Sequence, residues 1–274
     1  MTRLTREQVE NHIQMHGSAL KMRGQNLSGL DLSGLDLRGA DLRGANLRGT
    51  VLSGANLAEA RLASANLQGA RLEEADLSSA DLRRARLQRA ILNRANLLAA
   101  DLTAANLNRA RLRGATLHSL TDPETGTYLA WTRLRNTSLQ AADLQGANLS
   151  GANLTGANMQ QANLQEADLS YTNLSSQAGG RRTNLRRANL HQADLSYATV
   201  CGVDLRLAVL VGANLTAARL HPLANWRTDL RGADLRGANL HQTDLRQALY
   251  SRRTRWDETF VPSIAGAVTK WYLL

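Results

Sequence analysis

The residues best suited to metal or nucleophilic chemistry are few and scattered. The chain of 274 residues contains six histidines and one cysteine. His12 and His16 are four residues apart on a predicted helix, a spacing that can hold a metal ion, but no third ligand lies near them in the sequence. The other members of this set are widely separated: His118, His191, Cys201, His221 and His241. We therefore predict no metal site and no cofactor, and we expect Cys201 to point outward, because it follows the inward-facing Val200.

Phosphate-binding and acid–base motifs give no stronger signal. Gly179-Gly180 lies in a break of a repeat and lacks the strand-to-helix context of a phosphate-binding loop. Aspartates recur throughout the chain, but at outward positions, where no burial would shift their pKa toward catalytic values. The sequence therefore predicts a protein that is not an enzyme.

The element that must position every side chain is a five-residue repeat. Leucine occupies every fifth position from Leu27 to Leu117, usually two residues after an alanine, and the residue between them is mostly Asp or Asn, as in Ala40-Asp41-Leu42. Such a period fits neither a helix, on which five residues drift by about 140°, nor a flat strand, on which an odd period alternates faces. All the leucines can be buried together only if the backbone turns a corner in each repeat. The chain should therefore form a solenoid whose successive coils pair their backbone groups.

The triplet Ala-(Asp/Asn)-Leu, followed by two variable residues, resembles the pentapeptide-repeat family. The resemblance implies an all-β solenoid, a right-handed quadrilateral β-helix with four pentapeptides in each coil. Residues 25–250 would then form about eleven coils and a rod of roughly 50 Å, at about 4.8 Å per coil. Beyond Tyr250, Thr254-Arg255-Trp256 and Pro262 resemble the closing segment of cyanobacterial members of the family.

Both ends of the rod are predicted to carry a cap. Residues 1–24 would form the N-terminal cap, with a helix at about residues 6–16 that begins with the capping-box spacing of Thr5 and Gln8. Residues 251–274 would form the C-terminal cap, in which Ser263–Leu274 is interpreted as a short helix after Pro262. A homodimer through one of these terminal segments is the alternative interpretation.

Three breaks in the repeat predict loops that leave the rod. They lie near residues 118–127, 175–183 and 221–227, and the third break keeps the phase of the leucines. Tyr128 and Trp131 flank the first break in a chain that has few aromatic residues, so we include them among the candidate partner-binding residues.

The strongest chemical signal is positive charge. Lys and Arg number 33 against 23 Asp and Glu, a formal net charge of +10, and nearly all of the cations are arginine. With four pentapeptides in each coil, residues twenty apart stack, and this stacking predicts two arginine surfaces: Arg86, Arg89, Arg94, Arg109, Arg111 and Arg113 in the first half, and Arg186, Arg206 and Arg246 in the second. Like charges about 5 Å apart repel each other. Two interpretations stay open, namely local ion pairs on a solvated face and contact with an acidic partner.

These observations favour a non-catalytic protein-binding scaffold, a rigid basic rod that engages an acidic protein. Nucleic-acid binding is the second hypothesis: arginine binds phosphate well, but the aspartates are interleaved with the arginines and the aromatic residues form no stacking platform. Some members of the resembled family modulate gyrase or other topoisomerases as DNA-like rods, a role that requires negative charge. No apolar run could span a membrane and the N-terminus has no signal-peptide core, so we expect a cytoplasmic location.

Overall fold

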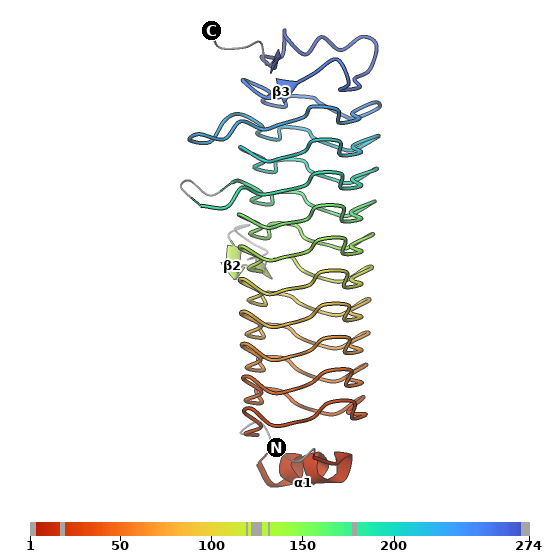
Figure 1. The fold of residues 1–274 in the computed structure, drawn as a ribbon, viewed down its shortest axis with the longest axis vertical. Coiled ribbons are helices and arrows are strands. Elements are labelled where there is room, and N and C mark those ends of the chain that lie inside the picture. The colour runs from red at the N-terminus through yellow and green to blue at the C-terminus, as the bar shows by residue number, and fades with distance from the viewer. Residues whose placement is uncertain are drawn as a thin grey trace.

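Each repeat forms one side of a coil and the turn that follows it. In the computed structural model Asn56 pairs with Asp76 of the next coil, and the side chain of Leu57 is buried. The amide of Ala60 donates to the carbonyl of Leu57 at 3.0 Å and closes a β-turn. The third residue of that turn, Glu59, has a φ of 60°, in the left-handed region. Repetition of this geometry builds a long rod of stacked coils (Figure 1).

The structure describes residues 4–16, 20–118, 120–121, 128–130, 132–176 and 180–269, with the backbone alone at 120–121 and 128–130. One helix and four short strands lie within these ranges: α1 (Arg6–His16), β1 (Leu120–Thr121), β2 (Tyr128–Ala130), β3 (Leu249–Tyr250) and β4 (Val268–Thr269). Most of the rod consists of single β-bridges between coils rather than of longer strands.

The coils stack in four parallel columns, because residues twenty apart pair with each other. We name the four sides of the rod by the first bridged residue of each column: side 1 from Asn26, side 2 from Asp31, side 3 from Asp36 and side 4 from Lys21. The column of side 1 has eleven bridged residues: Asn26, Asn46, Asn66, Arg86, Asn106, Ser138, Asn158, Asn184, Asp204, Asp229 and Leu249. The four columns agree with the quadrilateral coil that the resemblance implied.

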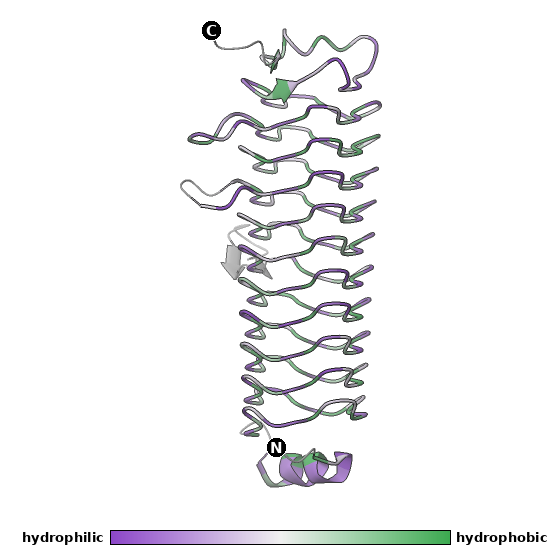
Figure 2. Cartoon of the chain, in the orientation of Figure 1, coloured by the Kyte–Doolittle hydropathy of each residue, from purple (hydrophilic) through white to green (hydrophobic). Residues whose placement is uncertain are grey.

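Leucine and alanine fill the core along the whole rod. Every fifth leucine from Leu27 to Leu117 is at most 2% exposed, which confirms the burial that the period predicted. Many of the Asp and Asn residues before the leucines are half-buried rather than exposed, because their side chains accept a backbone hydrogen bond; the amide of Gln68, for example, donates to Oδ1 of Asn66 at 3.3 Å. The same alternation of apolar and polar residues recurs in every coil (Figure 2).

Helix α1 lies at the N-terminal end of the rod (Figure 1). The amide of Gln8 donates to Oγ1 of Thr5 at 3.2 Å, and the amide of Thr5 donates to Oε1 of Gln8 at 2.8 Å, so the two residues form a capping box. Val9 is buried and Ile13 packs against the core. The helix therefore removes the apolar end of the first coil from solvent.

The C-terminal segment is not a helix over the residues that the structure describes, and the predicted helix from Ser263 is wrong there. After Pro262 the chain makes a single turn, in which the amide of Ala267 donates to the carbonyl of Pro262 and the amide of Gly266 to that of Ser263. Gly266 has a φ of 83° and ends the turn in the manner of a helix C-cap. Strand β4 then pairs in parallel with β3. Residues 270–274 lie outside the described residues.

Three insertions interrupt the regular stacking. The paired residues on either side of them are separated by 32, 26 and 25 positions instead of 20: Asp101 and Arg133, Asn158 and Asn184, Asp204 and Asp229. In the first insertion β1 and β2 form an antiparallel pair. In the third, Leu223 and Trp226 pair across a tight turn. The predicted loops at 118–127 and 175–183 lie partly outside the described residues.

Candidate protein-binding surfaces

An aspartate two places before an arginine usually pairs with that arginine and makes it less available to a partner. In Asp-Leu-Arg the two polar side chains flank the buried leucine and meet, as where Arg83 donates from Nε and Nη2 to the two oxygens of Asp81, each at 2.7 Å. These hydrogen bonds hold the pKa of Asp81 below its ordinary value. The same bidentate pair occurs at six arginines: Arg43, Arg83, Arg206, Arg231, Arg236 and Arg246. In these six triplets the arginine is neutralised by its own repeat; in the seventh, Asp36-Leu37-Arg38, the guanidinium of Arg38 instead donates to Oε1 of Glu59 in the next coil at 2.6 Å.

Four arginines of the first predicted surface have no such partner. We call them the lower patch: Arg86, Arg89, Arg109 and Arg111. Arg86, Arg89 and Arg109 lie on side 1, the last two at equivalent turn positions of adjacent coils, and Arg111 lies on the adjoining side 2. All four are exposed. Among the described residues none of their side chains makes an ion pair or a hydrogen bond.

The other two predicted members of the first surface are weakly paired, and the aromatic candidates beside the first break are not described. Arg94 lies 3.4 Å from a carboxylate oxygen of Glu74, and Arg113 lies 3.7 Å from one of Asp143. Both pairs are largely solvated, so each contributes little to stability. The side chain of Tyr128 and the whole of Trp131 lie outside the described residues.

The second predicted surface is misplaced in part. The insertion at 221–227 adds five residues, which keeps the phase of the leucines but advances the chain by one side of the coil. Arg246 therefore lies on side 4 and not in the predicted column. Sequence reasoning missed Arg231, whose Asp-Leu-Arg triplet directly after the break was the available signal. The column on side 1, which we call the upper column, consists of Arg186, Arg206 and Arg231.

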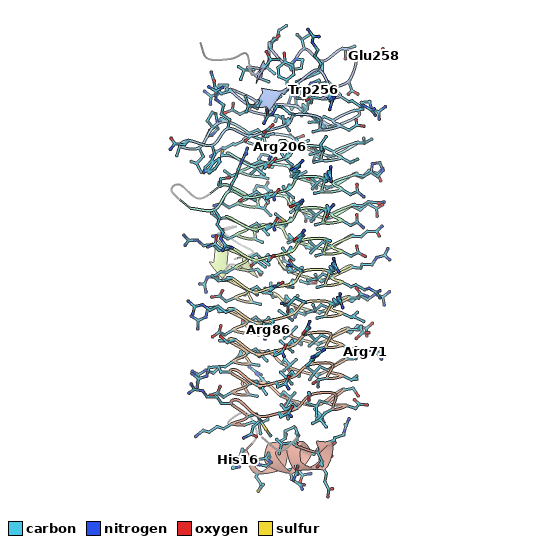
Figure 3. The ribbon with its side chains drawn as sticks, viewed as in Figure 1. His16, Arg71, Arg86, Arg206, Trp256 and Glu258 are labelled. Atoms are coloured by element: carbon cyan, nitrogen blue, oxygen red, sulfur yellow. The ribbon has the colours of Figure 1, made fainter. Side chains whose placement is uncertain are left out.

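Two arginines of the upper column hold buried carboxylates. Arg206 donates to both oxygens of Asp204, at 2.9 and 2.5 Å, and lies 3.6 Å from Asp229, to which Arg231 donates at 2.8 and 2.6 Å. Burial pushes the pKa of Asp204 up, but the hydrogen bonds from Arg206 outweigh burial, so that the pKa lies below its ordinary value. These two arginines therefore stabilise the fold by pairing with buried carboxylates. Figure 3 marks Arg86 of the lower patch and Arg206 in the opposite half of the rod.

Arg186 differs from its neighbours in the upper column. It follows Asn184-Leu185 instead of an aspartate, and it makes no ion pair among the described residues. Its Nε is buried without a hydrogen-bond partner. Because this guanidinium has no ion pair among the described residues, it can bind an anion from outside the chain.

Sequence reasoning also missed an exposed pair of stacked tyrosines. The rings of Tyr171 and Tyr197 lie 4.9 Å apart with an interplanar angle of 5°, and both side chains are about half exposed. They occupy the same turn position of side 3 in adjacent coils. The signal in the sequence is the repeated Ala-Asp-Leu-Ser-Tyr, which occurs on both sides of the second break.

Cys201 is buried although it is not part of the leucine and alanine core, so its turn position does not leave it exposed. Its Sγ lies 3.5 Å from Nε2 of His221, the first residue of the inserted segment 221–227. Farther along that segment, Trp226 packs beneath the guanidinium of Arg182, 5.3 Å from the ring centroid. Burial raises the pKa of the Cys201 thiol to about 11, which disfavours the reactive thiolate.

Within the described ranges, no group of three or more His, Cys, Asp and Glu residues could hold a metal ion. No helix in that part of the chain is long and apolar enough to span a membrane.

The coil and its surface define a class of protein: a repeat solenoid that presents patterned charge and exposed rings on a rigid rod. Eight copies of a pentapeptide-repeat model match the chain, at residues 21–54, 40–78, 55–94, 80–118, 125–161, 142–176, 183–221 and 226–249. The chain belongs to the pentapeptide-repeat family. No curated protein matches it.

Several solved structures are similar to this chain. HetL, a pentapeptide-repeat protein from the cyanobacterium Nostoc sp. strain PCC 7120 that is involved in regulation of heterocyst differentiation, is 32% identical, with 90% of this chain and 97% of that chain covered and a TM-score of 0.56. Alr5209, a pentapeptide-repeat protein from Nostoc PCC 7120, is 36% identical over 45% of this chain and 84% of its own, with a TM-score of 0.18. QnrB1, a plasmid-mediated fluoroquinolone resistance protein, is 17% identical over 85% of this chain and 92% of its own, with a TM-score of 0.32.

Proposed function

We propose that the protein is a non-catalytic scaffold that binds an acidic protein through the lower patch. The observation that carries the proposal is the set of four exposed arginines on adjacent coils with no carboxylate partner among the described residues. Like charges on neighbouring coils repel each other, and Gln, Ser or Asn would occupy the same outward positions without that repulsion. An acidic surface that covers the patch would remove the repulsion and gain charge-assisted hydrogen bonds.

The rigidity of the rod supports this role. We take it to be a right-handed β-helix of about eleven coils, at about 4.8 Å per coil, closed by α1 at one end and by residues 251–269 at the other. A stack of this kind changes little on binding, so its surface can be complementary to a partner before contact. A cytoplasmic location and a homodimer through a terminal segment stay predictions.

Nucleic-acid binding is the second candidate. The unpaired arginines would suit phosphate groups, but the stacked tyrosines lie on side 3, away from the lower patch on sides 1 and 2. Bases held at the patch would therefore lack a ring to stack on. This separation favours a protein partner.

A charge-matched pair of variants tests the proposal. In the patch variant Arg86, Arg89, Arg109 and Arg111 are changed to Gln. The control variant loses the same charge from four arginines that are paired with their own aspartates and lie on other sides of the rod or in other coils: Arg43, Arg83, Arg236 and Arg246. Binding of the protein that the wild type captures from native extract, and of duplex DNA, is measured by surface plasmon resonance across a salt series.

We expect the patch variant to bind the captured protein more weakly than wild type and control. The difference should shrink with added salt, since exposed charges are screened over about 10 Å at about 0.1 M ionic strength. Duplex DNA should bind weakly to all three proteins near physiological salt. If the patch variant matches the control at every salt concentration, the lower patch is not the binding surface. Tighter binding of DNA than of the protein would favour the nucleic-acid candidate instead.

A further inference from the structure

A groove rich in arginine lies at the corner between sides 1 and 2 in the C-terminal coils. It consists of two adjoining depressions of about 300 and 510 Å³, which share Leu207, Gly232 and Arg253. We call it the upper groove. Its lining includes one carboxylate, that of Asp234, and six arginines: Arg186, Arg206, Arg231, Arg252, Arg253 and Arg255.

Only part of this positive charge is neutralised within the chain. Arg206 and Arg231 form ion pairs with Asp204 and Asp229, respectively. Arg255 lies 3.6 Å from a carboxylate oxygen of Asp234. Arg186, Arg252 and Arg253 have no ion pair among the described residues. Three guanidinium groups along the groove are therefore available to an anion.

The floor of the groove between these cations is aliphatic. Leu207 and Val209 are each 40% exposed. Leu207 has a φ of 60° and is the only leucine at positive φ in the described chain. Gly232 in the next coil makes room for it, because a Cβ at Gly232 would lie 2.7 Å from Cδ2 of Leu207. The local sequence thus places a large apolar side chain at a turn position where small or polar residues usually stand.

We propose that the upper groove binds an extended acidic segment of a partner protein. Carboxylates of the segment would pair with Arg186, Arg252 and Arg253, and an aliphatic side chain would lie on Leu207 and Val209. The inference rests on the proposed function, because it takes the rod to bind an acidic protein, but it uses a surface separate from the lower patch. From Arg186 to Arg253 the groove spans successive coils over about 14 Å, the length of about four residues of extended chain.

The composition of the lining selects a polypeptide rather than a nucleic acid. Among the residues that the structure describes, no aromatic ring lines either depression, so an unstacked base would find no platform on them. Aliphatic side chains gain from burial against Leu207 and Val209. A segment that alternates acidic and aliphatic residues complements both features of the groove.

Two synthetic peptides test the inference on the full chain by fluorescence anisotropy: a short glutamate-rich peptide with a central leucine, and the same peptide with glycine in place of that leucine. The wild type should bind the leucine peptide more tightly. In Arg186→Gln/Arg253→Gln the affinity should fall by about tenfold or more, as expected for lost charge-assisted hydrogen bonds. Leu207→Gly, which the positive φ tolerates, should abolish the preference for leucine.

The lower patch variant provides the control that separates the two proposals. It should bind the leucine peptide as the wild type does. If the Arg186→Gln/Arg253→Gln protein binds as tightly as wild type, or if affinity falls only in the lower patch variant, the upper groove is not a peptide site; the second result would leave the proposed function intact. Tighter binding of a single-stranded oligonucleotide than of the leucine peptide at the groove would also overturn the inference.

Discussion

Replacing Arg206 by Gln should destabilise the rod even though its side chain reaches the surface. The side chain of Arg206 is 36% exposed, but those of Asp204 and Asp229 are only 8% and 2% exposed. Removal of one partner from a fully buried ion pair costs about 3 to 5 kcal/mol. Here solvent reaches the guanidinium and Arg231 still holds Asp229, so we expect a loss of about 2 kcal/mol in the free energy of unfolding. For a chain of this size, such a loss lowers Tm by about 4 °C.

The assay is thermal unfolding followed by circular dichroism near neutral pH, with Arg89→Gln as the matched control. Arg89 has no side-chain partner among the described residues, so its substitution should change stability by less than about 0.5 kcal/mol. Adding Asp204→Asn to Arg206→Gln should restore most of the loss, because Asn184 occupies the same column one coil earlier and accepts the amide of Arg186 at 2.9 Å. Equal Tm values for the two arginine variants, or a double variant no more stable than Arg206→Gln, would refute the claim that Arg206 stabilises the rod by pairing with buried carboxylates.

Three further outcomes are expected. Leu67→Arg should abolish cooperative unfolding, because it places an unpaired charge at a fully buried position; a native-like melting curve would contradict the coil. The hydrogen bonds from Arg43 lower the pKa of Asp41 from 3.8 to about 2, so the stability from this pair is present above the higher value and is lost as pH falls toward the lower one; Asp41→Asn should flatten acid unfolding in that window. Cys201 should resist alkylation near pH 8, since burial raises its pKa to about 11, and should react on unfolding; fast labelling of the native protein would contradict its burial.

The five-residue period predicted the coil because every leucine can be buried only if the backbone turns a corner in each repeat. It also predicted the start of α1, where Thr5 and Gln8 satisfy each other's amides through local hydrogen bonds. The prediction of a C-terminal helix was wrong because the segment makes tertiary contacts with the last coil. Residues after Pro262 have helical spacing of apolar side chains, but Gly266 ends the turn, and the amide of Val268 instead donates to the carbonyl of Ala248 in the last coil.

The position of an arginine around the rod could be predicted only as far as the count of residues stayed regular. An insertion of five residues does not change the phase of a five-residue repeat. The segment 221–227 therefore kept the leucine positions regular, while it shifted every later repeat to the next side of the rod. Arg246 was misplaced and Arg231 was missed for this reason. His221, the first residue of that segment, contacts the thiol of Cys201, and no local pattern around Cys201 reveals this contact.

The residue before each leucine therefore has two separable effects on the rod. Asp and Asn both accept the amide two residues later, as Asp204 does from Arg206 at 3.1 Å and Asn184 does from Arg186 at 2.9 Å, so either one supports the turn. In six of the seven Asp-Leu-Arg triplets, Asp also neutralises the arginine that follows the leucine. The choice between Asp and Asn thus adjusts the free charge of a coil while the backbone stays the same. Under the proposed function, a partner's charge is recognised where this choice leaves arginines unpaired on adjacent coils, as in the lower patch.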